Sequence, residues 1–274
     1  MKDKISLAGD LGSGKSTVSK ILIDRLGAEY YHTGAIVREV AERHGMSVVE
    51  LNHYMETHPE IDREIDDGLI ALSGVDKLLV IDSRMAWHFT KGTFKIYLST
   101  DIETSAARIM RANRKGEHAM TLEQTVDDTR ARRISEQKRY FGFYGVDIKD
   151  LTNYDLIVDT TYATPEEIAE VIIASFERWQ ADKTFRAAFI SPERLHYVDD
   201  EQQSEDVELY SGMINSGSEP EVVVVESAGE FYVKSGTAAT LAYALDMRTF
   251  VKARLDKYDG EAERATYVRM KNSL

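Results

Sequence analysis

The chain has 274 residues, enough for one large domain or two ordinary ones. Its composition, with 43% hydrophobic and 30% charged residues, is typical of a globular protein. It contains no cysteine, which excludes disulfides, thiolate metal sites and a cysteine nucleophile, and a net charge of −13 does not favour a nucleic-acid partner. No apolar stretch approaches the roughly eighteen residues of a membrane-spanning helix and no leader pattern precedes the first apolar run, so we expect a cytoplasmic protein without a membrane partner, its oligomeric state open.

Apolar runs that predict strands alternate with helical spacings over the first two-thirds of the chain. In chain order, the predicted elements are a strand at 4–8, a helix at 15–26, a strand at 30–32, a helix at 33–44, helical segments over 48–73, strands at 78–81 and 94–98, helices at 102–114 and 121–140, a strand at 155–159 and a helix from 164 to about 180. Thr164-Pro165 offers the last helix a cap and a proline at its first position. This alternation predicts an α/β fold with a five-stranded parallel sheet flanked by helices.

The alternation stops near residue 183, and we expect a domain boundary between about 181 and 188. Residues 1–182 then form the α/β domain and residues 186–274 a small α+β domain. The second segment contains a strand-like pair at 189–190, an acidic run at 199–208 that is the best candidate for disorder, and apolar runs at 221–225 and 230–233 that predict a hairpin with Ala228-Gly229 at its turn.

The most specific motif lies between the first predicted strand and the first predicted helix. Residues 9–17 read GDLGSGKST and fit G-x-x-x-x-G-K-[ST], a loop whose glycines let several backbone N–H groups point at one phosphate. The N-terminus of the following helix adds the positive end of its dipole. Lys15 can reach the β- and γ-phosphates and Ser16 can offer its hydroxyl to Mg²⁺, so the motif predicts ATP and Mg²⁺ as cofactors. The predicted nucleotide-binding residues are Gly9, Gly12, Ser13, Gly14, Lys15, Ser16 and Thr17.

Four further segments give residues 1–178 a resemblance to archaeal-type cytidylate kinases. They are residues 32–38 (HTGAIVR), 59–66 (PEIDREID), 82–87 (DSRMAW) and a long stretch that includes Arg132, 135–140 (SEQKRY), 144–148 (YGVDI) and 154–156 (YDL). The last stretch matches that family in both residues and spacing. The resemblance implies a P-loop kinase that transfers a phosphoryl group from ATP–Mg²⁺ to a nucleoside or deoxynucleoside monophosphate, with a pyrimidine such as CMP or dCMP as the expected acceptor.

The resemblance also implies which residues hold the acceptor. Arg38 and Arg84 would hold its phosphate, a contact for which each guanidinium offers two parallel donors. Thr33, Gly34 and Asp62 complete the implied acceptor site. Thr33 and Ser83 differ from the residues that the family usually has beside the acceptor, so the identity of the base stays open.

Phosphoryl transfer depends on positioning and on neutralising negative charge, which explains an expected set of arginines. Arg132 and Arg139 lie seven residues apart, share a helix face and would close over the transferring group. Asp82 ends a predicted strand, where it would hold water on Mg²⁺. The implied catalytic residues are Lys15, Asp82, Arg84, Arg132 and Arg139, and the implied metal site consists of Ser16 and Asp82.

Several of these side chains also have an ordinary structural interpretation. Asp82 could cap its strand or pair with Arg84. A solvated basic helix face is favoured over a lid role for Arg108, Arg111, Arg114 and Arg130. Core positions are favoured for Trp87 and for the aromatic run at 140–144, and the seven histidines show no metal-ligand spacing.

Two other functions remain open at the sequence level. The first is a kinase acting on a hydroxyl, such as a hydroxymethylated pyrimidine in DNA or a modified nucleotide, with Asp82 as the general base. The second is a regulatory protein that only senses ATP, although such a protein would not need the acceptor-site arginines.

The C-terminal segment shows a second resemblance. Residues 190–195 (ISPERL) and 230–239 (EFYVKSGTAA) resemble a ParB/sulfiredoxin-like domain. That family has charged residues after its strand, as Gly-His-His-Arg or Gly-Glu-Arg-Arg, whereas residues 236–239 read GTAA. The resemblance implies a degenerate accessory domain that docks a substrate, a partner or a second subunit.

Overall fold

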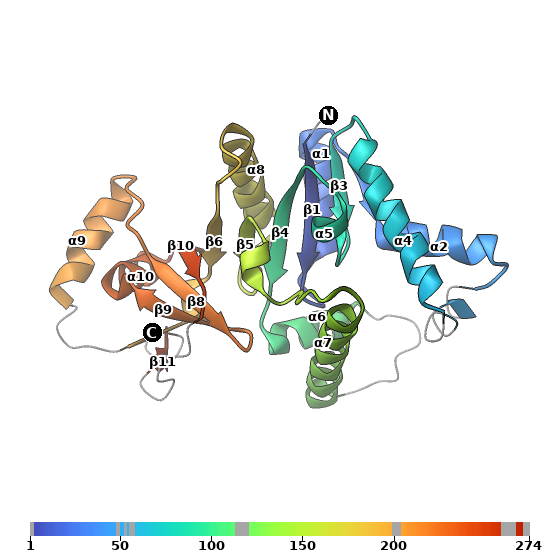
Figure 1. Ribbon diagram of the computed structural model, residues 1–274. Coiled ribbons are helices and arrows are strands. Elements are labelled where there is room, and N and C mark those ends of the chain that lie inside the picture. The colour runs from blue at the N-terminus through green and yellow to red at the C-terminus, as the bar shows by residue number, and fades with distance from the viewer. Residues whose placement is uncertain are drawn as a thin grey trace. The chain divides into compact units, whose positions relative to one another are not determined.

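The structure is a computed structural model that describes residues 3–47, 50, 51, 54, 58–112, 121–198, 204–258 and 267–270 (Figure 1). The chain divides into two compact units. The first comprises Met1–Gly9 and Gly14–Ile96, and the second comprises Asp10–Ser13 and Tyr97–Leu274. Strand β4 (Thr93–Ser99) therefore begins in the first unit and ends in the second.

The first unit contains a parallel sheet in which β3 (Leu79–Asp82) lies between β1 (Lys4–Gly9) and β2 (Glu29–His32). All residues of β1 are buried, as expected of a strand in a parallel sheet that is covered on both faces. Asp82, at the carboxyl end of β3, pairs in register with Leu7 and with His32. The helices of this unit are α1 (Lys15–Leu26), α2 (Thr33–Arg43), α4 (Pro59–Ala71) and α5 (Ala86–Phe89), with a 3-10 turn η1 (Leu72–Gly74).

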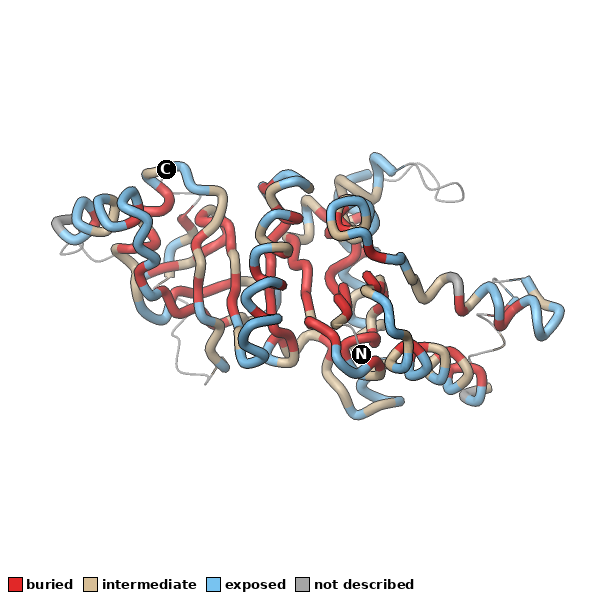
Figure 2. The backbone as a smooth tube through the Cα atoms, turned by 90° about the horizontal axis from the view of Figure 1, so that it is seen from above, coloured by how far each residue is buried: buried red, intermediate tan, exposed pale blue. Residues whose placement is uncertain are grey.

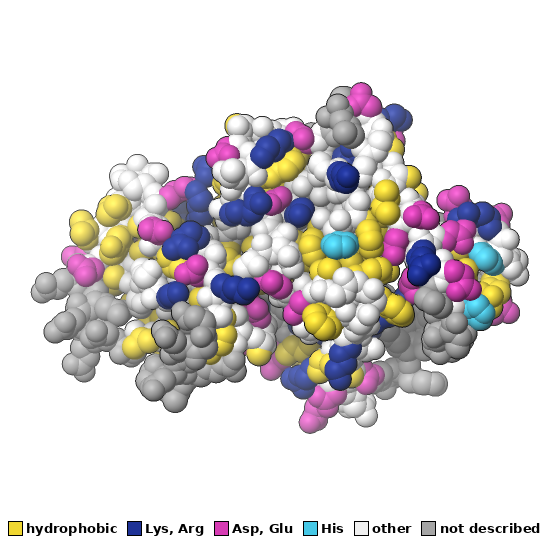
Figure 3. Space-filling model, in the orientation of Figure 1, with side chains coloured by type: hydrophobic (Ala, Val, Ile, Leu, Met, Phe, Trp, Pro, Cys, Tyr) yellow, Lys and Arg dark blue, Asp and Glu magenta, His cyan; other side chains and the backbone are white. Residues whose placement is uncertain are grey.

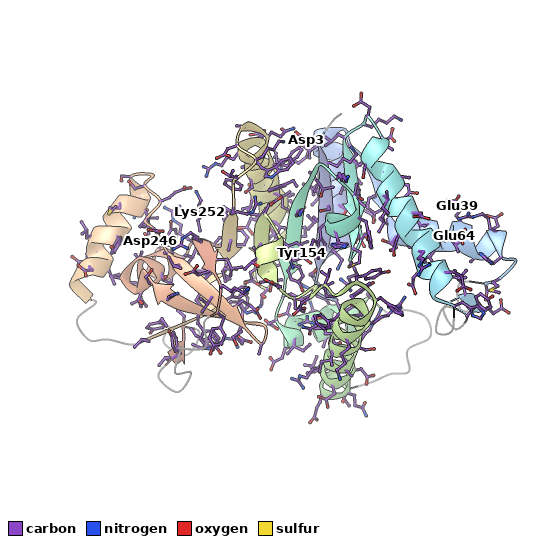
Figure 4. All side chains as sticks on the ribbon, in the orientation of Figure 1. Asp3, Glu39, Glu64, Tyr154, Asp246 and Lys252 are labelled. Atoms are coloured by element: carbon purple, nitrogen blue, oxygen red, sulfur yellow. The ribbon has the colours of Figure 1, made fainter. Side chains whose placement is uncertain are left out.

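A polar cluster joins the C-terminal end of α2 to the middle of α4, where Glu64 lies (Figure 4). Glu64 forms an ion pair with Arg43 at 2.5 Å and a hydrogen bond with His44 at 3.1 Å. Gly68 of α4 lets this helix approach α2 closely, because a Cβ at Gly68 would lie 3.2 Å from the Ile36 side chain. The pair therefore forms one packed element that carries the predicted acceptor residues.

The second unit contains a mixed sheet with strand order β5–β6–β10–β8–β9–β7–β11. Its strands are β5 (Leu156–Asp159), β6 (Ala187–Ile190), β7 (Leu195–Val198), β8 (Val223–Ser227), β9 (Glu230–Ser235), β10 (Val251–Asp256) and β11 (Tyr267–Arg269). Its helices are α6 (Ile102–Arg111), α7 (Leu122–Tyr144), α8 (Pro165–Ala181), α9 (Ser204–Asn215) and α10 (Thr237–Leu245), with 3-10 turns η2 (Leu151–Asn153) and η3 (Pro192–Arg194). Figure 2 shows buried residues in both units, and they come from helices such as α1, α8 and α10 as well as from the strands.

The sheet of the second unit continues across the expected domain boundary. Strand β6 pairs in parallel with β5, with Leu156 opposite Ala187, and β10 pairs antiparallel with β6. The α/β class with a parallel sheet is confirmed. A five-stranded core and a separate domain at 186–274 stay predictions.

Local signals in the sequence agree with the observed helix ends and turns. Thr164 caps α8 in a capping box with Glu167, and Pro165 occupies the first helical position, as predicted. Strands β8 and β9 form the predicted hairpin, and Ala228 and Gly229 at its turn have φ values of 56° and 87°.

Four sequence expectations need correction. Helix α6 ends at Arg111 rather than at 114, and Arg114 lies outside the described residues. Helix α7 continues beyond 140 to Tyr144, where Gly145 in the left-handed region ends it. The run 199–208, expected to be disordered, has its residues 204–208 in α9, and 199–203 lie outside the described residues. In the aromatic run at 140–144, Phe141 and Phe143 are exposed, whereas Trp87 is in the core as predicted.

The charges on the face shown in Figure 3 are mixed, with Lys and Arg interspersed among Asp and Glu. Within the described parts of the chain, no helix is both long and apolar enough to cross a membrane.

Candidate phosphotransfer site

The glycine-rich loop joins the end of β1 to the start of α1, the context that the motif requires. Gly14 precedes the helix with a φ of 83°, a left-handed conformation that side chains rarely adopt. Gly12 has a φ of 71°, and a Cβ there would lie 2.7 Å from the Ser105 carbonyl oxygen. Glycine is therefore required at both positions, and the loop backbone is left free to wrap round a small anion.

Two cations of the first unit converge on one carbonyl of this loop. The Lys15 ammonium donates a hydrogen bond to the Gly9 carbonyl oxygen at 3.2 Å, and the Arg84 guanidinium donates to the same oxygen. Arg84 lies just beyond β3, and its own carbonyl accepts a hydrogen bond from the Trp87 indole at 2.9 Å. Because Lys15 and Arg84 share an acceptor, both are held where an anion in the loop would meet two positive charges.

Asp82 lies at the same edge of the sheet and has a partner that the sequence did not suggest. The Tyr30 hydroxyl donates to its carboxylate at 3.2 Å. Partial burial, together with the negative charge and the hydrogen bond of Asp82, raises the pKa of Tyr30 to about 12. Asp82 thus has a hydrogen bond from Tyr30, and Arg84 has one to the loop. The alternative interpretation that pairs Asp82 with Arg84 stays a prediction.

Apart from Arg84, the predicted acceptor residues of the first unit lie on α2 and α4. Arg38 contacts His32 at 3.1 Å, and the rings of His32 and Tyr30 stack with centroids 5.4 Å apart. Thr33 begins α2, and its hydroxyl oxygen is buried without a hydrogen-bond partner among the described residues. The remaining two predicted residues are Gly34, at the start of α2, and Asp62, which is buried in the first turns of α4.

In the second unit, Asp10 is the centre of a buried network that the motif alone did not reveal. Its carboxylate accepts hydrogen bonds from the Lys149 ammonium, from the Tyr97 hydroxyl at 2.9 Å and from the Thr100 backbone N–H at 3.1 Å. Arg133 lies 3.7 Å away. Burial raises the pKa of Asp10, but the charges of Lys149 and Arg133 and the hydrogen bonds outweigh burial, so the pKa lies well below its usual value.

Arg108 of α6 is not on a solvated face, contrary to the favoured interpretation of the sequence. It is half-buried, and it donates to the Gly12 carbonyl of the loop at 3.4 Å. It also donates to the carbonyl oxygens of Thr160 at 2.6 Å and Thr161 at 3.3 Å. A basic residue on a polar helix gives no sequence signal for such a contact.

The two predicted arginines of α7 do share its exposed surface. Arg132 is 55% exposed and pairs with Glu136 at 3.6 Å, and the Arg139 guanidinium lies over the Phe143 ring at 5.9 Å. The adjacent Arg133, which the resemblance did not single out, is the one that reaches Asp10. Arg111 and Arg130 are exposed, as the solvated-face interpretation expected, and Arg130 pairs with Asp127 at 3.1 Å.

The loop residues fit a nucleoside triphosphate with Mg²⁺. Ser13 is 1% exposed, and its hydroxyl oxygen has no hydrogen-bond partner in the described part of the chain, while Ser16 and Thr17 are exposed in the first turn of α1. Across the described ranges, no group of three His, Cys, Asp or Glu residues could hold a metal alone. Mg²⁺ at nucleotide sites needs only one or two protein ligands, because phosphates and water supply the others, so Ser16 and Asp82 would suffice.

Comparison with known proteins agrees with this geometry. A model of the cytidylate kinase-like family matches residues 4–162. A cytidylate kinase from Thermoplasma volcanium is 36% identical over 174 residues, which cover 62% of this chain and 89% of that protein. An S-adenosylmethionine-dependent nucleotide dehydratase from Lacinutrix mariniflava is 36% identical over 185 residues, 66% of this chain and 37% of that protein. A solved structure of an uncharacterized protein from Eubacterium ventriosum, 14% identical, covers 64% of this chain and 99% of its own with a TM-score of 0.51, which supports the fold alone.

A strand–loop–helix phosphate cradle at the edge of a parallel sheet, with a lysine and an arginine held to it, defines a P-loop kinase, an ATP-dependent phosphotransferase. The chain belongs to the cytidylate kinase-like family, whose model spans more than half of its length.

Proposed function

We propose that the protein transfers the γ-phosphoryl group of ATP–Mg²⁺ to a pyrimidine nucleoside monophosphate such as CMP or dCMP. The observation that carries the proposal is the shared contact of Lys15 and Arg84 with the Gly9 carbonyl, since one cation serves the donor phosphates and the other the acceptor phosphate. Family membership supports a nucleoside monophosphate kinase.

In this proposal the chain's main work is to position two anions and neutralise their repulsion. The loop amides and Lys15 hold the β- and γ-phosphates. Arg84 and Arg38 hold the acceptor phosphate, with Thr33, Gly34 and Asp62 around the acceptor. Arg132 and Arg139, the arginines that the resemblance singles out, are proposed to neutralise charge on the transferring group.

Ser16 and Asp82 are proposed as the residues on the Mg²⁺ side, the serine through its hydroxyl and the aspartate through water. A monophosphate acceptor already carries an anionic oxygen, so no side chain has to remove a proton. The hydrogen bond from the Tyr30 hydroxyl fixes the position of the Asp82 carboxylate.

The test is a panel of acceptors with ATP–Mg²⁺ and labelled γ-phosphate. It contains CMP, dCMP, UMP, dTMP and AMP, then the nucleosides, then DNA with hydroxymethylated pyrimidines, and follows ADP release and the labelled product. We expect label on CMP or dCMP. Label on DNA or a nucleoside with no monophosphate turnover would overturn the proposal in favour of a hydroxyl acceptor.

The variant Asp82→Asn adds a second discriminating measurement. A monophosphate kinase should keep measurable turnover, because the acceptor needs no general base, and its requirement for Mg²⁺ should rise. A hydroxyl kinase would lose nearly all turnover at every Mg²⁺ concentration, since the acceptor proton would have no base to receive it.

A further inference from the structure

Arg194 lies in the 3-10 turn η3 of the C-terminal segment. Its side chain is completely buried and contacts the end of β5. It donates to the Asp159 carboxylate at 3.3 Å, to the Thr161 hydroxyl at 2.9 Å and to the Gly229 carbonyl at 2.8 Å. Asp159 is also 0% exposed and accepts a second bond from the same segment, from the Ser191 N–H at 3.2 Å. The turn after β5 is thus held from the C-terminal segment by both Arg194 and Ser191.

Stability alone does not account well for this arginine. A buried ion pair loses hydration on both charges, and well-packed apolar side chains often replace such a pair without loss of stability. The Nε atom of Arg194 is buried and has no hydrogen-bond partner among the described residues, which adds to the cost. Burial raises the pKa of Asp159, and Arg194 together with the bonds from Thr161 and Ser191 opposes that rise. What the pair does provide is a fixed conformation for residues 159–161.

That turn leads directly to the phosphate loop. The Thr161 hydroxyl donates to Asp159 at 2.6 Å and accepts from the Asp101 N–H, at the start of α6, at 3.1 Å. The carbonyls of Thr160 and Thr161 hold the Arg108 guanidinium, which in turn donates to the carbonyl of Gly12. An unbroken series of contacts within the second unit therefore runs from Arg194 to the loop.

We propose that Arg194 is a positioning residue for ATP binding, which fixes the turn at 159–161 so that Arg108 holds the phosphate loop at Gly12. The C-terminal segment is then a part of the donor side of the kinase. This inference rests on the proposed use of the loop for ATP–Mg²⁺ and extends it to a residue outside the region that the family model matches.

The experiment uses the full chain with three variants, Arg194→Met, Arg194→Lys and Thr161→Val, and the control Arg254→Met. Arg254 lies in the same segment, is exposed and pairs with Glu221 and Asp256. For each protein we would measure ATP affinity by titration with a fluorescent ATP analogue, and the KM values for ATP and CMP. We would also measure hydrogen exchange at the amides of Gly12 and Ser13, and unfolding in urea.

We expect Arg194→Met to weaken ATP binding by about tenfold or more, the effect of losing a charged hydrogen bond that orders a site, and to speed exchange at Gly12 and Ser13. The KM for CMP should change little, Arg194→Lys should restore part of the ATP affinity, and the control should match wild type. Thr161→Val should shift ATP affinity in the same direction, and it serves as the test if Arg194→Met does not fold.

Unchanged ATP affinity and unchanged exchange in variants that unfold at lower urea would overturn the inference and leave Arg194 a structural residue. Equal losses of ATP and CMP affinity would also overturn it. Failure of wild type to bind ATP would instead contradict the proposed function, so the two failures are distinguishable.

Discussion

At the scale of single residues, the phosphate loop shows why some functional side chains can be predicted and others cannot. Lys15 is predicted by the glycine-rich motif, and Asp82 is predicted by its position at the end of a buried strand. Arg108 and Arg133 are not predicted, because each lies on a polar helix where many charged residues are simply solvated, and only the tertiary structure brings them to Gly12 and Asp10. Lys15 is half-buried and donates a hydrogen bond to the Gly9 carbonyl, a contact that the motif does not predict.

The first prediction concerns Lys15. Lys15→Ala should lower turnover by about a thousandfold or more, because the positive charge that would stabilise the transferring phosphoryl group is lost. Its unfolding midpoint should stay close to that of wild type. The matched control is Lys20→Ala, which removes an exposed lysine from the same helix. Turnover like that of wild type in Lys15→Ala would refute the assignment of the loop.

The second prediction concerns Arg84. Arg84→Lys should raise the KM for the acceptor more than the KM for ATP, because lysine keeps the charge but loses the planar pair of donors. Arg43→Lys, at an exposed arginine paired with Glu64, is the control. A collapse of ATP affinity with an unchanged acceptor KM would show that the division of the site between donor and acceptor is wrong.

At the scale of elements, the sequence predicts boundaries well where local chemistry decides them. Thr164-Pro165 sets the start of α8, and the Ala228-Gly229 turn sets the hairpin of β8 and β9. Helix α7 shows the limit of such reasoning. Its aromatic run at 140–144 has the composition of a core segment, yet Phe141 and Phe143 are exposed, because the helix extends a further turn before Gly145 ends it.

The third prediction concerns how the stability of the fold depends on pH, and it rests on the contact between Asp10 and Arg133 of α7. The pKa of Asp10 is lowered in the folded protein, so at acid pH the unfolded chain binds a proton that the native state does not. Asp10 therefore stabilises the fold above the ordinary aspartate pKa of 3.8, and this contribution is lost as the pH falls below that value. Asp10→Asn should be less stable at neutral pH, with a smaller further loss on acidification.

Urea unfolding between pH 7 and pH 2.5 measures this dependence. Asp24→Asn, which alters an exposed carboxylate on α1, provides the comparison and should follow wild type. If the slope of stability against acid pH in Asp10→Asn equals that of wild type, the buried network does not hold Asp10 ionised.

At the scale of the whole molecule, the alternation of strands and helices was enough to predict the α/β class, but not how the C-terminal segment attaches. The alternation of predicted strands and helices stops near residue 183, which favours a domain boundary there. The pairing of β6 with β5 depends on backbone hydrogen bonds, and backbone groups leave no mark on residue type. Nothing in the sequence distinguishes Arg194 from the other basic residues, of which the chain has thirty-four in all.

The fourth prediction follows from this attachment. A chain that ends after Asp182 loses β6, the neighbour of β5, and it also loses Arg194, the ion-pair partner of Asp159. Removing one partner of a buried ion pair alone costs about 3–5 kcal/mol, so we expect the shortened chain to unfold at markedly lower urea concentration than the full chain. The control is Met247→Ser, a change at the surface of the removed segment. Equal unfolding midpoints would show that residues 186–274 are an independent domain.

The hydrogen bond between the Trp87 indole and the Arg84 carbonyl has an optical consequence. The chain has two tryptophans, and they fall one in each compact unit, with Trp179 in α8 of the second. In a Trp179→Phe variant the remaining indole emits from beside the arginine-bearing turn. Its emission wavelength and quenching would then report the state of that turn in real time, without an attached dye.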